Sequence, residues 1–572
     1  MHYDGYADAQ GFAQVGLNAP PSPSGDPGIS PLPVIADAPS TAPPQVPSPS
    51  ETCDIVIIGT GAGGAPLLAR FAQAGLSVVA LEAGKRFAPA DFATDERAQS
   101  DKIFWNSERL SAGNDPVAFG NNNSGSGVGG STLHYTAYTP RPHPDDFRLH
   151  TDTGVGADWP LSYDDLEPYL TEAEQFLGVS GIADYPWGGH RSKTYPLAPL
   201  PLNSAAQLME RGCATLGIRT APAANAALSG RYYQPGVGWR EACTNRGFCQ
   251  AGCSVGAKAS MDVTYIRLAE QHGAKVYPDC FATQIETDGT GRVTGVVYIR
   301  EGRTHRITCR RAAFLCAGAI ESPRLLLLNE LGNETGQVGR NFMAHPGLQL
   351  WAQFDDVTRP NRGIPGGLIS EDTHRPETAT ADLVKKNVNF VGGYLLQSIG
   401  VMPVTYASQL SRGVGLFGDD LLDHLRGYNH VAGINILGEG LPYPGNFMEL
   451  SDEKDERGLP KPRIHHTAGD NENNLTAHAD KVMRAIFAEA GAAKNVWSFQ
   501  RFAHALGTCR MGTDPQTSVV NPDCRVHAMP NLYICDNSIF PSSLAVNPAL
   551  TQIAVALRTA DRFLAAGKRG DA

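Results

Sequence analysis

Apolar and polar positions near the start of the chain follow a strand–helix–strand pattern. Residues 54–58 (DIVII) and 77–81 (SVVAL) form short apolar runs, and residues 65–74 (APLLARFAQA) between them carry apolar side chains at helical spacing. A short apolar run bounded by turn residues is typical of a strand buried on both faces, whereas a spacing of three and four residues is typical of an amphipathic helix. The pattern therefore predicts one βαβ unit.

The same kind of signal recurs toward the other end. Residues 310–330 (RRAAFLCAGAIESPRLLLLNE) predict a strand, a Gly turn and a helix. Residues 531–536 (NLYICD) predict a strand, and residues 548–566 predict a helix that begins with proline, a residue favoured at that position. The segments 150–240 and 350–500 are less regular and aromatic.

Composition limits the class of protein. The chain has 572 residues, which is too long for one ordinary hydrophobic core, so at least two structural units are expected. The net charge of −11 argues against a nucleic-acid partner, because such proteins need a basic face. The sequence has no apolar run of about 18 residues, so we predict no transmembrane helix.

The first 50 residues differ from the rest. They hold 11 of the 41 prolines and no lysine or arginine, and the first positive side chain is Arg70. Such a segment cannot bury a core, so residues 1–50 are predicted to form a disordered tail. Secretory, Tat and mitochondrial signals need a basic segment, which is missing here, so the chain by itself is expected in the cytoplasm.

A Gly-rich turn joins the first predicted strand to its helix. Gly59, Gly61 and Gly64 form a G-x-G-x-x-G motif, which allows a tight turn, close approach of a pyrophosphate and packing of the helix on the strand. Glu82 ends the second strand, where a carboxylate can accept hydrogen bonds from both ribose hydroxyls. This order predicts dinucleotide binding, and the motif alone does not separate NAD from FAD.

A second Gly-rich segment spans residues 120–147. It contains Gly127 and Gly130, which permit close backbone contact with a flat or anionic group, and His134 follows four residues after the latter. Two Gly-rich loops for one ligand indicate a large, extended cofactor.

Three of the 11 cysteines share one short segment, residues 241–260. Cys243, Cys249 and Cys253 are spaced C-x5-C-x3-C on a Gly-rich loop. Soft thiolates suit iron–sulfur ligation. Each of the three irons of a [3Fe–4S] cluster needs one ligand from outside the cluster, so three cysteines are enough. A disulfide or no ligand at all is the alternative, and zinc is disfavoured because its structural sites usually take four ligands. The other cysteines are expected to be core residues: Cys53, Cys213, Cys280, Cys309, Cys316, Cys509, Cys524 and Cys535.

Separated motifs carry a resemblance to a known family. DIVIIGTGAGG, GSGVGGSTLHY, LCAGAIESPRLLL and HALGTCRMG, followed by NLYICDNSIFPSSLAVNPALT, occur in this order between residues 52 and 566. Together they resemble the glucose–methanol–choline (GMC) oxidoreductases, which are FAD enzymes. Within that family, ADWPLSYDDLEPYL and the cysteine segment are most similar to the large flavoprotein subunits of bacterial gluconate, fructose and FAD-dependent glucose dehydrogenases.

The resemblance implies an α/β fold, α+β overall, with a Rossmann-type FAD-binding domain and a substrate domain that contains an antiparallel sheet. The FAD-binding domain would be discontinuous, comprising residues 51–148, 255–345 and 500–572. The substrate domain would comprise residues 149–254 and 346–499, with the cysteine segment in its first part.

Roles for individual residues also follow from the resemblance. His504 matches the family's catalytic histidine and would take the hydroxyl proton of the substrate, and Asn547 matches its partner and would hold the same oxygen. Asp536 matches an acid near the FAD phosphate and ribityl chain. His134 matches a position at which some members bond FAD covalently. The remaining expected FAD contacts in these motifs are Gly318, Asn547 and Thr551.

The sequence departs from the family pattern at one place. In GRNFMAHPG (339–347), Ala344 stands where an acid usually precedes His345. We expect this difference to affect local packing rather than chemistry.

These features predict an FAD-dependent dehydrogenase that oxidises a hydroxyl of a sugar, sugar acid or polyol to a carbonyl. Electrons would leave through the cluster to a haem or quinone acceptor, with a small Tat-signalled subunit and a cytochrome c as partners. Co-export with that subunit would place the chain in the periplasm. The alternatives are a GMC oxidase that uses O₂, a long-chain alcohol oxidoreductase and a non-catalytic flavin-binding subunit. The presence of His504, Asn547 and both Gly-rich loops argues against the last.

Overall fold

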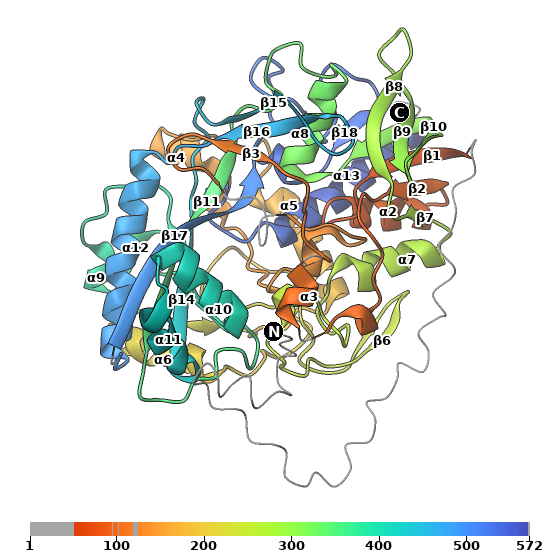
Figure 1. Ribbon diagram of the computed structural model, residues 1–572. Coiled ribbons are helices and arrows are strands. Elements are labelled where there is room, and N and C mark those ends of the chain that lie inside the picture. The colour runs from red at the N-terminus through yellow and green to blue at the C-terminus, as the bar shows by residue number, and fades with distance from the viewer. Residues whose placement is uncertain (1–50, 94, 101, 118–123, 493, 570–572) are drawn as a thin grey trace, which may run out of the picture.

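The computed structural model describes residues 51–569 apart from 94, 101, 118–123 and 493. The tail predicted over residues 1–50 lies outside the described residues. The described chain forms two large sheets. In Figure 1 one lies on the right, around β1 (Glu51–Ile58), and the other on the left, around β14 (Val431–Gly438).

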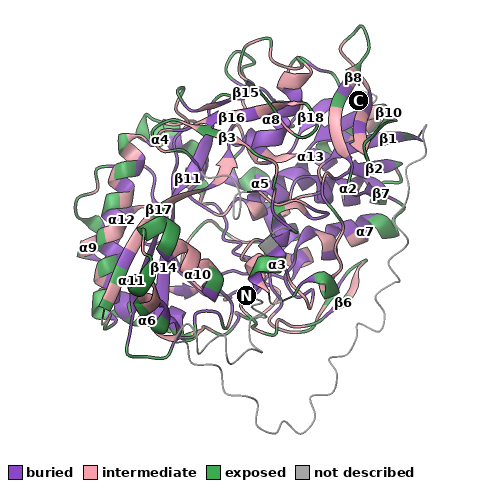
Figure 2. Cartoon of the chain, in the orientation of Figure 1, coloured by how far each residue is buried: buried purple, intermediate pink, exposed green. Residues whose placement is uncertain are grey.

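The first sheet has seven strands in the order β7-β2-β1-β10-β9-β8, with β18 beside β10. The strands β7, β2, β1, β10 and β18 run parallel, and β8 and β9 extend the sheet as an antiparallel ribbon. In Figure 2 β1 and β2 are largely buried, as expected for parallel strands with both faces covered. Besides β1, the strands are β2 (Val78–Leu81), β7 (Lys275–Tyr277), β8 (Phe281–Thr287), β9 (Val293–Arg300), β10 (Arg303–Leu315) and β18 (Leu532–Ile534).

Helices predicted at both ends of the sequence are confirmed. The first is α2 (Gly64–Gln73), the second is α8 (Gly318–Leu328) and the last is α13 (Ala549–Arg569), which Pro548 directly precedes. The helix α2 packs against α13 and α7 (Tyr265–Gln271), and these helices form a layer beside the parallel sheet.

The second sheet is antiparallel and has six strands in the order β17-β11-β14-β13-β12-β4. Two helices, α6 (Ser204–Thr215) and α12 (Asp470–Glu489), pack against each other and against this sheet. The antiparallel sheet that the family resemblance implied is therefore present. Besides β14, its strands are β4 (Ala221–Pro222), β11 (Met343–Gln353), β12 (Leu368–Ser370), β13 (Tyr394–Ile399) and β17 (Lys494–Leu506).

The expected domain boundaries need correction at three places. The boundaries at 345/346 and 499/500 cut through β11 and β17, which pair along their whole length in the antiparallel sheet. Helix α5 (Tyr163–Leu177), assigned to the substrate domain, packs against α13 of the FAD-binding side. The sequence does not show where these domain boundaries lie, because a buried strand has the same apolar pattern in either sheet.

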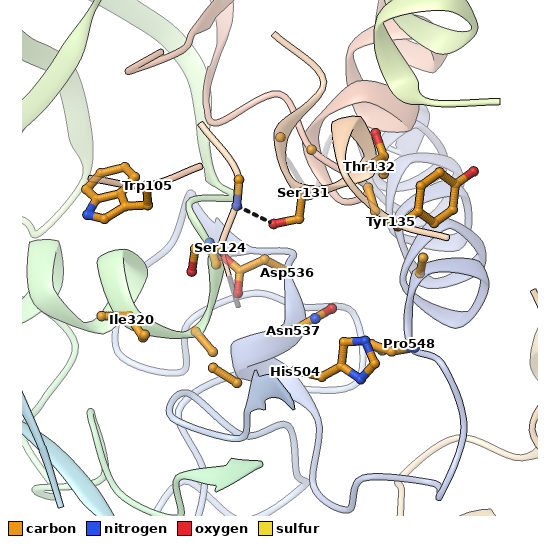
Figure 3. Close-up of a pocket in the computed structure, with 18 of the residues that line it drawn as sticks. Trp105, Ser124, Ser131, Thr132, Tyr135, Ile320, His504, Asp536, Asn537 and Pro548 are labelled. Carbon is orange, nitrogen blue, oxygen red and sulfur yellow. Dashed lines mark hydrogen bonds between the residues drawn. The ribbon is translucent and has the colours of Figure 1, made fainter. Parts of the chain in front are cut away.

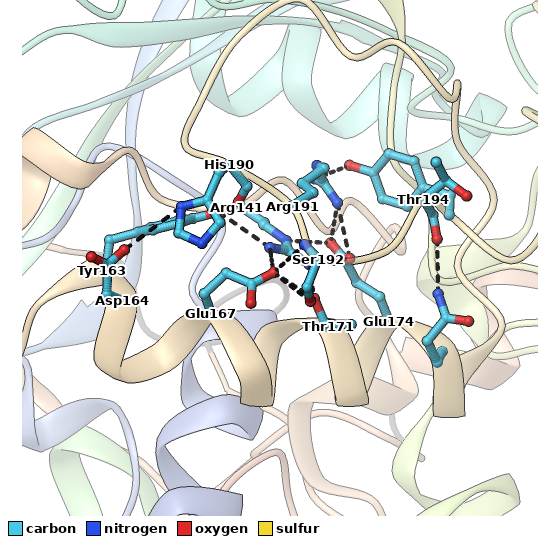
Figure 4. A network of polar contacts seen from close by, with 12 residues as sticks. Arg141, Tyr163, Asp164, Glu167, Thr171, Glu174, His190, Arg191, Ser192 and Thr194 are labelled. Atoms are coloured by element: carbon cyan, nitrogen blue, oxygen red, sulfur yellow. Dashed lines mark hydrogen bonds and ion pairs between the residues drawn. The ribbon is translucent and has the colours of Figure 1, made fainter.

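One buried ion-pair network fixes α5 to the loop before it (Figure 4). Arg141 lies 3.1 Å from Glu167 and 2.6 Å from Glu174, and Arg191 adds a second guanidinium 2.9 Å from Glu174. All four side chains are at least 87% buried, since the most exposed of them, Arg191, has a side-chain exposure of 13%. Two cations thus neutralise two carboxylates that α5 places about two turns apart.

Smaller elements complete the fold. No helix of the described residues is long and apolar enough to cross a membrane. The remaining helices and strands are α3 (Glu96–Ser100), β3 (Leu110–Ala112), α4 (Leu149–Thr153), β5 (Tyr232–Gln234), β6 (Gly238–Arg240), α9 (Asp382–Lys385), α10 (Pro403–Gln409), α11 (Gly418–Arg426), β15 (Phe447–Lys454) and β16 (Pro460–His465).

Candidate active site

A cavity lies between the two sheets. Its walls come from the turn between β1 and α2, the second Gly-rich loop, the strands β11, β13, β14 and β17, and the start of α13. Figure 3 shows His504 beside Pro548 and Asn537, with the loop that carries Ser131 and Tyr135 across from them. The parallel sheet therefore supplies one end of the cavity and the antiparallel sheet the other.

The first Gly-rich turn has the backbone that the motif predicts. Gly59 has a φ of +99°, and a Cβ there would lie 2.3 Å from the carbonyl oxygen of Cys316. A Cβ on Gly64 would lie 2.0 Å from the carbonyl oxygen of Gly59, so this glycine lets the helix pack on the turn and does not line the cavity. Gly61 does line it, with its nearest neighbour 3.8 Å from where a Cβ would stand.

The second Gly-rich loop touches the first. A Cβ on Gly130 would lie 2.7 Å from the Cα of Gly61, and both residues line the cavity. Gly127 lies behind this contact, with a φ of +135° and its N–H 3.4 Å from Oε1 of Glu82. The two loops therefore form one continuous wall of backbone on this side of the cavity.

Glu82 lines the cavity but serves mainly to hold these loops. Its carboxylate accepts hydrogen bonds from the N–H and hydroxyl of Thr60, at 3.1 and 2.7 Å, and from the N–H of Gly84 at 3.0 Å. Burial raises the pKa of Glu82, and these donors act in the opposite direction. The sequence predicts that Glu82 binds a ribose. The structure shows in addition that Glu82 accepts a hydrogen bond from the backbone of the first Gly-rich turn.

Asp536 connects three parts of the FAD-binding side. It accepts hydrogen bonds from the N–H of Gly318, at 2.9 Å, and from the N–H of Ser538, at 2.8 Å. Asp536 and Gly318 line the cavity, and a Cβ on Gly318 would have no neighbour within 4 Å. Thr551, in contrast, is fully buried behind the wall and is not among the residues that line the cavity.

His134 lines the cavity with an unused ring nitrogen. The residue is buried, its ring lies 4.7 Å from that of Phe104, and Nε2 has no hydrogen-bond partner within the described chain. Burial, followed by the nearby ammonium of Lys258, lowers the pKa of His134 to about 3. The imidazole is therefore neutral at physiological pH, and Nε2 has no protein partner.

His504 is held at the end of a chain of hydrogen bonds. Its Nδ1 lies 3.2 Å from Nδ1 of His345, and Nε2 of His345 lies 2.9 Å from the carbonyl oxygen of Ser543. A carbonyl only accepts, so His345 carries its proton on Nε2 and its Nδ1 must accept from Nδ1–H of His504. Nε2 of His504 then keeps a lone pair. Burial first, and then His345 and Arg501, lower the pKa of His504 well below 6.5, so the ring is neutral.

Asn547 stands at the same cavity and already has one partner. Its Oδ1 accepts a hydrogen bond from Nε2 of Gln397 at 2.7 Å. The side-chain N–H groups of Asn547 are then the ones left for a ligand, and they can donate to an oxygen. A substrate oxygen in the cavity would find a lone pair from His504 and a donor from Asn547.

Sequence reasoning missed three residues of this site. His345 is named in the sequence analysis only as the neighbour of Ala344, with no role of its own, and Gln397 and Arg501 are not predicted at the site. Gln397 lies on β13 and Arg501 on β17, and both line the cavity. The HPG sequence is the one feature that could have drawn attention to His345. Gln397 and Arg501 come to the cavity of His504 through strand pairing, which the sequence does not show.

The cysteine segment lies on the far side of the second Gly-rich loop. Cys243, Cys249 and Cys253 are partly buried free thiols, and Cys243 and Cys253 accept hydrogen bonds from the N–H groups of Asn245 and Lys258, at 3.4 and 3.5 Å. Burial, and then the nearby thiolates of Cys253 and Cys243, raise the pKa of Cys249 to about 12.

Spacing decides against zinc at these cysteines. A tetrahedral zinc ion with bonds of about 2.3 Å would hold its thiolates about 3.8 Å apart. In the part of the chain that the structure describes, the three sulfurs do not form a group whose atoms all lie within 4.8 Å of one another.

Lys258 connects the cysteine segment to the cavity wall. Its buried ammonium donates to the carbonyl oxygens of Cys249 at 2.6 Å, Leu133 at 2.8 Å and Tyr135 at 3.2 Å. Leu133 and Tyr135 flank His134 in the sequence. Lys258 thus connects the loop that carries Cys249, a candidate metal ligand, to the loop that carries His134, a candidate flavin contact.

The cavity fits an extended dinucleotide. The open space beside Gly61 and Gly318, the touching glycine loops and the unpaired Nε2 of His134 lie along one wall. A flat group with a phosphate chain matches backbone N–H groups at a helix start, and the reactive ring would lie toward His504.

Comparisons with known proteins agree with this geometry. Two family models, both described as GMC oxidoreductase, match residues 100–347 and 442–556. The fructose dehydrogenase large subunit of Gluconobacter japonicus is 29% identical over 563 residues, which cover 91% of this chain and 99% of that protein. The gluconate 2-dehydrogenase flavoprotein of Pantoea cypripedii is 25% identical over 568 residues, which cover 86% of this chain and 91% of that protein.

A solved structure shows the same fold. A formate oxidase variant from Aspergillus oryzae RIB40 aligns with a TM-score of 0.66 at 14% identity, over 91% of this chain and all of that one. The two family models match strands of both sheets, among them β9, β10 and β18 of the parallel sheet and β4 and β17 of the antiparallel sheet. The chain therefore belongs to the GMC oxidoreductase family and is an FAD-dependent oxidoreductase that acts on CH–OH donors.

Proposed function

We propose that this protein is a dehydrogenase that oxidises a hydroxyl of a sugar, sugar acid or polyol and passes the electrons to a partner protein rather than to O₂. The observation that carries the catalytic part is the chain from Ser543 through His345 to His504, because it leaves Nε2 of His504 as an unprotonated base in the cavity. The electron-transfer part is supported by the three cysteines and Lys258.

The reaction removes two hydrogens from one alcohol. His504 Nε2 takes the hydroxyl proton, and Asn547 donates a hydrogen bond to the same oxygen as negative charge develops on it. Bound FAD supplies the acceptor for the hydride that leaves carbon. The C–H and O–H bonds break, the two electrons leave carbon with the hydride, a carbonyl forms, and His504 carries the proton away.

The residues that would hold FAD are those of the glycine wall. Gly59, Gly61 and Gly130 shape its backbone, Glu82 and Asp536 hold the loops at either end, and His134 would be the residue that bonds the flavin ring if FAD is attached covalently. Acid precipitation tests the covalent bond: flavin that stays with the pellet supports a link at His134, and flavin that is released excludes it.

His504→Ala tests the proposed base. A general base contributes about 10²–10⁴-fold, so the rate of flavin reduction by alcohol under anaerobic conditions should fall by about 100-fold or more while FAD stays bound. His478→Gln, at a buried histidine of α12 away from the cavity, is the matched control. A His504→Ala enzyme that reduces its flavin at the normal rate would refute the assignment.

The cysteine segment is the proposed site of a [3Fe–4S] cluster held by Cys243, Cys249 and Cys253. Such a cluster, when bound, exchanges single electrons, which suits transfer from a two-electron flavin to a haem or quinone partner. Backbone N–H groups that point at sulfur, as at Cys243 and Cys253, are typical of iron–sulfur sites, where they tune the potential. A substrate oxidase that uses O₂ needs no such relay.

Metal analysis decides between the cluster and its alternatives. Protein purified without oxygen should contain about three irons per chain by the stoichiometry of the cluster, together with acid-labile sulfide, and Cys249→Ser should lose both. Fewer than two irons per wild-type chain would overturn the cluster. Rapid O₂ consumption with an alcohol, without need of a dye acceptor, would favour the oxidase.

The partner and the compartment follow from the same proposal. We infer that a small subunit and a cytochrome c receive the electrons, and that the chain reaches the periplasm only together with a subunit that carries a Tat signal. Fractionation of cells that make the chain with and without its co-purifying subunit tests this. A chain that stays in the cytoplasm in both cases would contradict co-export.

A further inference from the structure

One cationic side chain in the cavity has no partner. Three arginines line the cavity, and two of them, Arg109 and Arg324, lie 3.0 Å from the carboxylate of Glu321. Arg501 is the third, and within the described chain its guanidinium makes no ion pair and no side-chain hydrogen bond. Its stem lies across from Gly347 on β11, where a Cβ would stand 3.4 Å from Cγ of Arg501.

Arg501 is partly buried in the cavity wall, and removing a guanidinium from water without a counter-ion is costly, so this position favours a ligand that brings an anion. Burial lowers the pKa of Arg501, and within the described residues no carboxylate forms an ion pair with it. The remaining acids of the wall, Glu82 and Asp536, are engaged with backbone N–H groups at the FAD-binding end. Arg501 lies instead on β17, three residues before His504.

Beside Arg501 lies a row of amides. Gln349 of β11 pairs across the sheet with Asn435 of β14, which pairs in turn with Gln397 of β13. All three line the cavity, and Oε1 of Gln349 is buried without a hydrogen-bond partner in the described structure. Amides offer both donors and acceptors, which is what successive hydroxyl groups require.

We propose that the substrate is a polyhydroxy carboxylic acid whose carboxylate binds Arg501 and whose hydroxyl chain lies along the row of Gln349, Asn435 and Gln397. A planar guanidinium can hold a carboxylate through two parallel hydrogen bonds, which fixes the direction of the bound chain as well as its charge. Another hydroxyl of the same molecule would then reach Nε2 of His504. This inference rests on the proposed alcohol oxidation and narrows its substrate class to sugar acids.

Three compounds that differ only at one end test the inference. D-Gluconate, D-glucitol and 1-amino-1-deoxy-D-glucitol present a carboxylate, a neutral hydroxymethyl and an ammonium group on the same hydroxyl chain. The readout is anaerobic flavin reduction. Because a hydrogen bond to a charged group contributes more than a neutral one, kcat/KM should be about 10- to 100-fold higher for gluconate than for glucitol, and lowest for the amine. Equal values, or a preference for the neutral compound, would overturn the inference.

Two variants separate carboxylate binding from other roles. Arg501→Gln should bring the gluconate-to-glucitol ratio of kcat/KM close to one, because it lowers the gluconate value much more than the glucitol value, and Arg501→Lys should keep part of the preference. An equal loss for both compounds, together with a shifted flavin potential, would assign Arg501 to the flavin instead and overturn the inference.

Binding without turnover completes the test. In the His504→Ala enzyme, the flavin absorbance should change on titration with gluconate. The double variant His504→Ala, Arg501→Gln should have a Kd for gluconate that is about 10-fold higher or more. An unchanged Kd would contradict the proposed contact even where gluconate is not oxidised. If no alcohol of a broad panel reduces the wild-type flavin, the proposed function fails. If neutral polyols reduce it and carboxylates gain nothing, only the inference about Arg501 fails.

Discussion

The contact between His345 and His504 allows the catalytic geometry to be tested at a residue that does not touch the substrate. His345 accepts from Nδ1–H of His504 at 3.2 Å and donates to the carbonyl of Ser543 at 2.9 Å. His345→Leu removes the acceptor and leaves Nδ1–H of His504 buried without a partner. The ring of His504 is then free to rotate or to move its proton to Nε2, and either change removes the lone pair that takes the substrate proton.

The size of the effect follows from the lost hydrogen bond. Leaving a buried donor unsatisfied costs about 1–3 kcal/mol. If that cost falls on the catalytically competent orientation, the rate of flavin reduction should drop by about 5- to 150-fold. His345→Asn keeps a carbonyl oxygen close to the position of Nδ1, so it should restore most of the rate.

Stopped-flow measurement of flavin absorbance under anaerobic conditions gives this rate directly, without the later transfer of electrons. Flavin content and Tm are measured alongside, because His345→Leu also leaves the Ser543 carbonyl without its donor. The control is again His478→Gln, which alters a buried histidine elsewhere and should leave the rate unchanged. A His345→Leu enzyme with normal flavin content and an unaltered rate would refute the positioning role, as would equal losses in the Leu and Asn variants.

Further predictions concern pH, cofactor binding and stability. The active form of His504 is neutral and its pKa is below 6.5, so kcat/KM for an uncharged polyol should stay level from pH 6.5 upward and fall only in more acidic solution; a decline centred above pH 6.5 would contradict this. Gly130→Ala would place a Cβ 2.7 Å from the facing loop and should lower the ratio of flavin to protein, whereas Gly154→Ala, with a similar positive φ and open space, should not. Arg141→Leu leaves buried carboxylates short of a cation and should destabilise the fold by about 3–5 kcal/mol in denaturant titration, whereas Arg148→Leu, at an exposed pair, should leave the midpoint unchanged.

Local signals in the sequence were sufficient for the parallel sheet and its cofactor turn. The apolar run at 54–58, the helical spacing at 65–74 and the G-x-G-x-x-G motif each depend on neighbours a few residues away, and the structure reproduces them as β1, α2 and the turn between them. The contact between Gly61 and Gly130 also follows from composition, since only two loops without side chains can approach so closely.

Long-range pairing decided the rest. The domain boundaries fall inside β11 and β17 because the apolar pattern of a buried strand does not tell which sheet it joins. His345 became a partner of His504 because a shift in the pairing of these strands places their rings together, 159 residues apart in the chain.

The sequence by itself predicted a dinucleotide site and identified His504 as the match to the family's catalytic histidine, because those features are written in short motifs. Only the tertiary structure showed which ring nitrogen of His504 carries the proton and which cation lines the cavity beside it. Those properties depend on side chains that four strands of one sheet bring to the same cavity, and no periodicity along the chain records them.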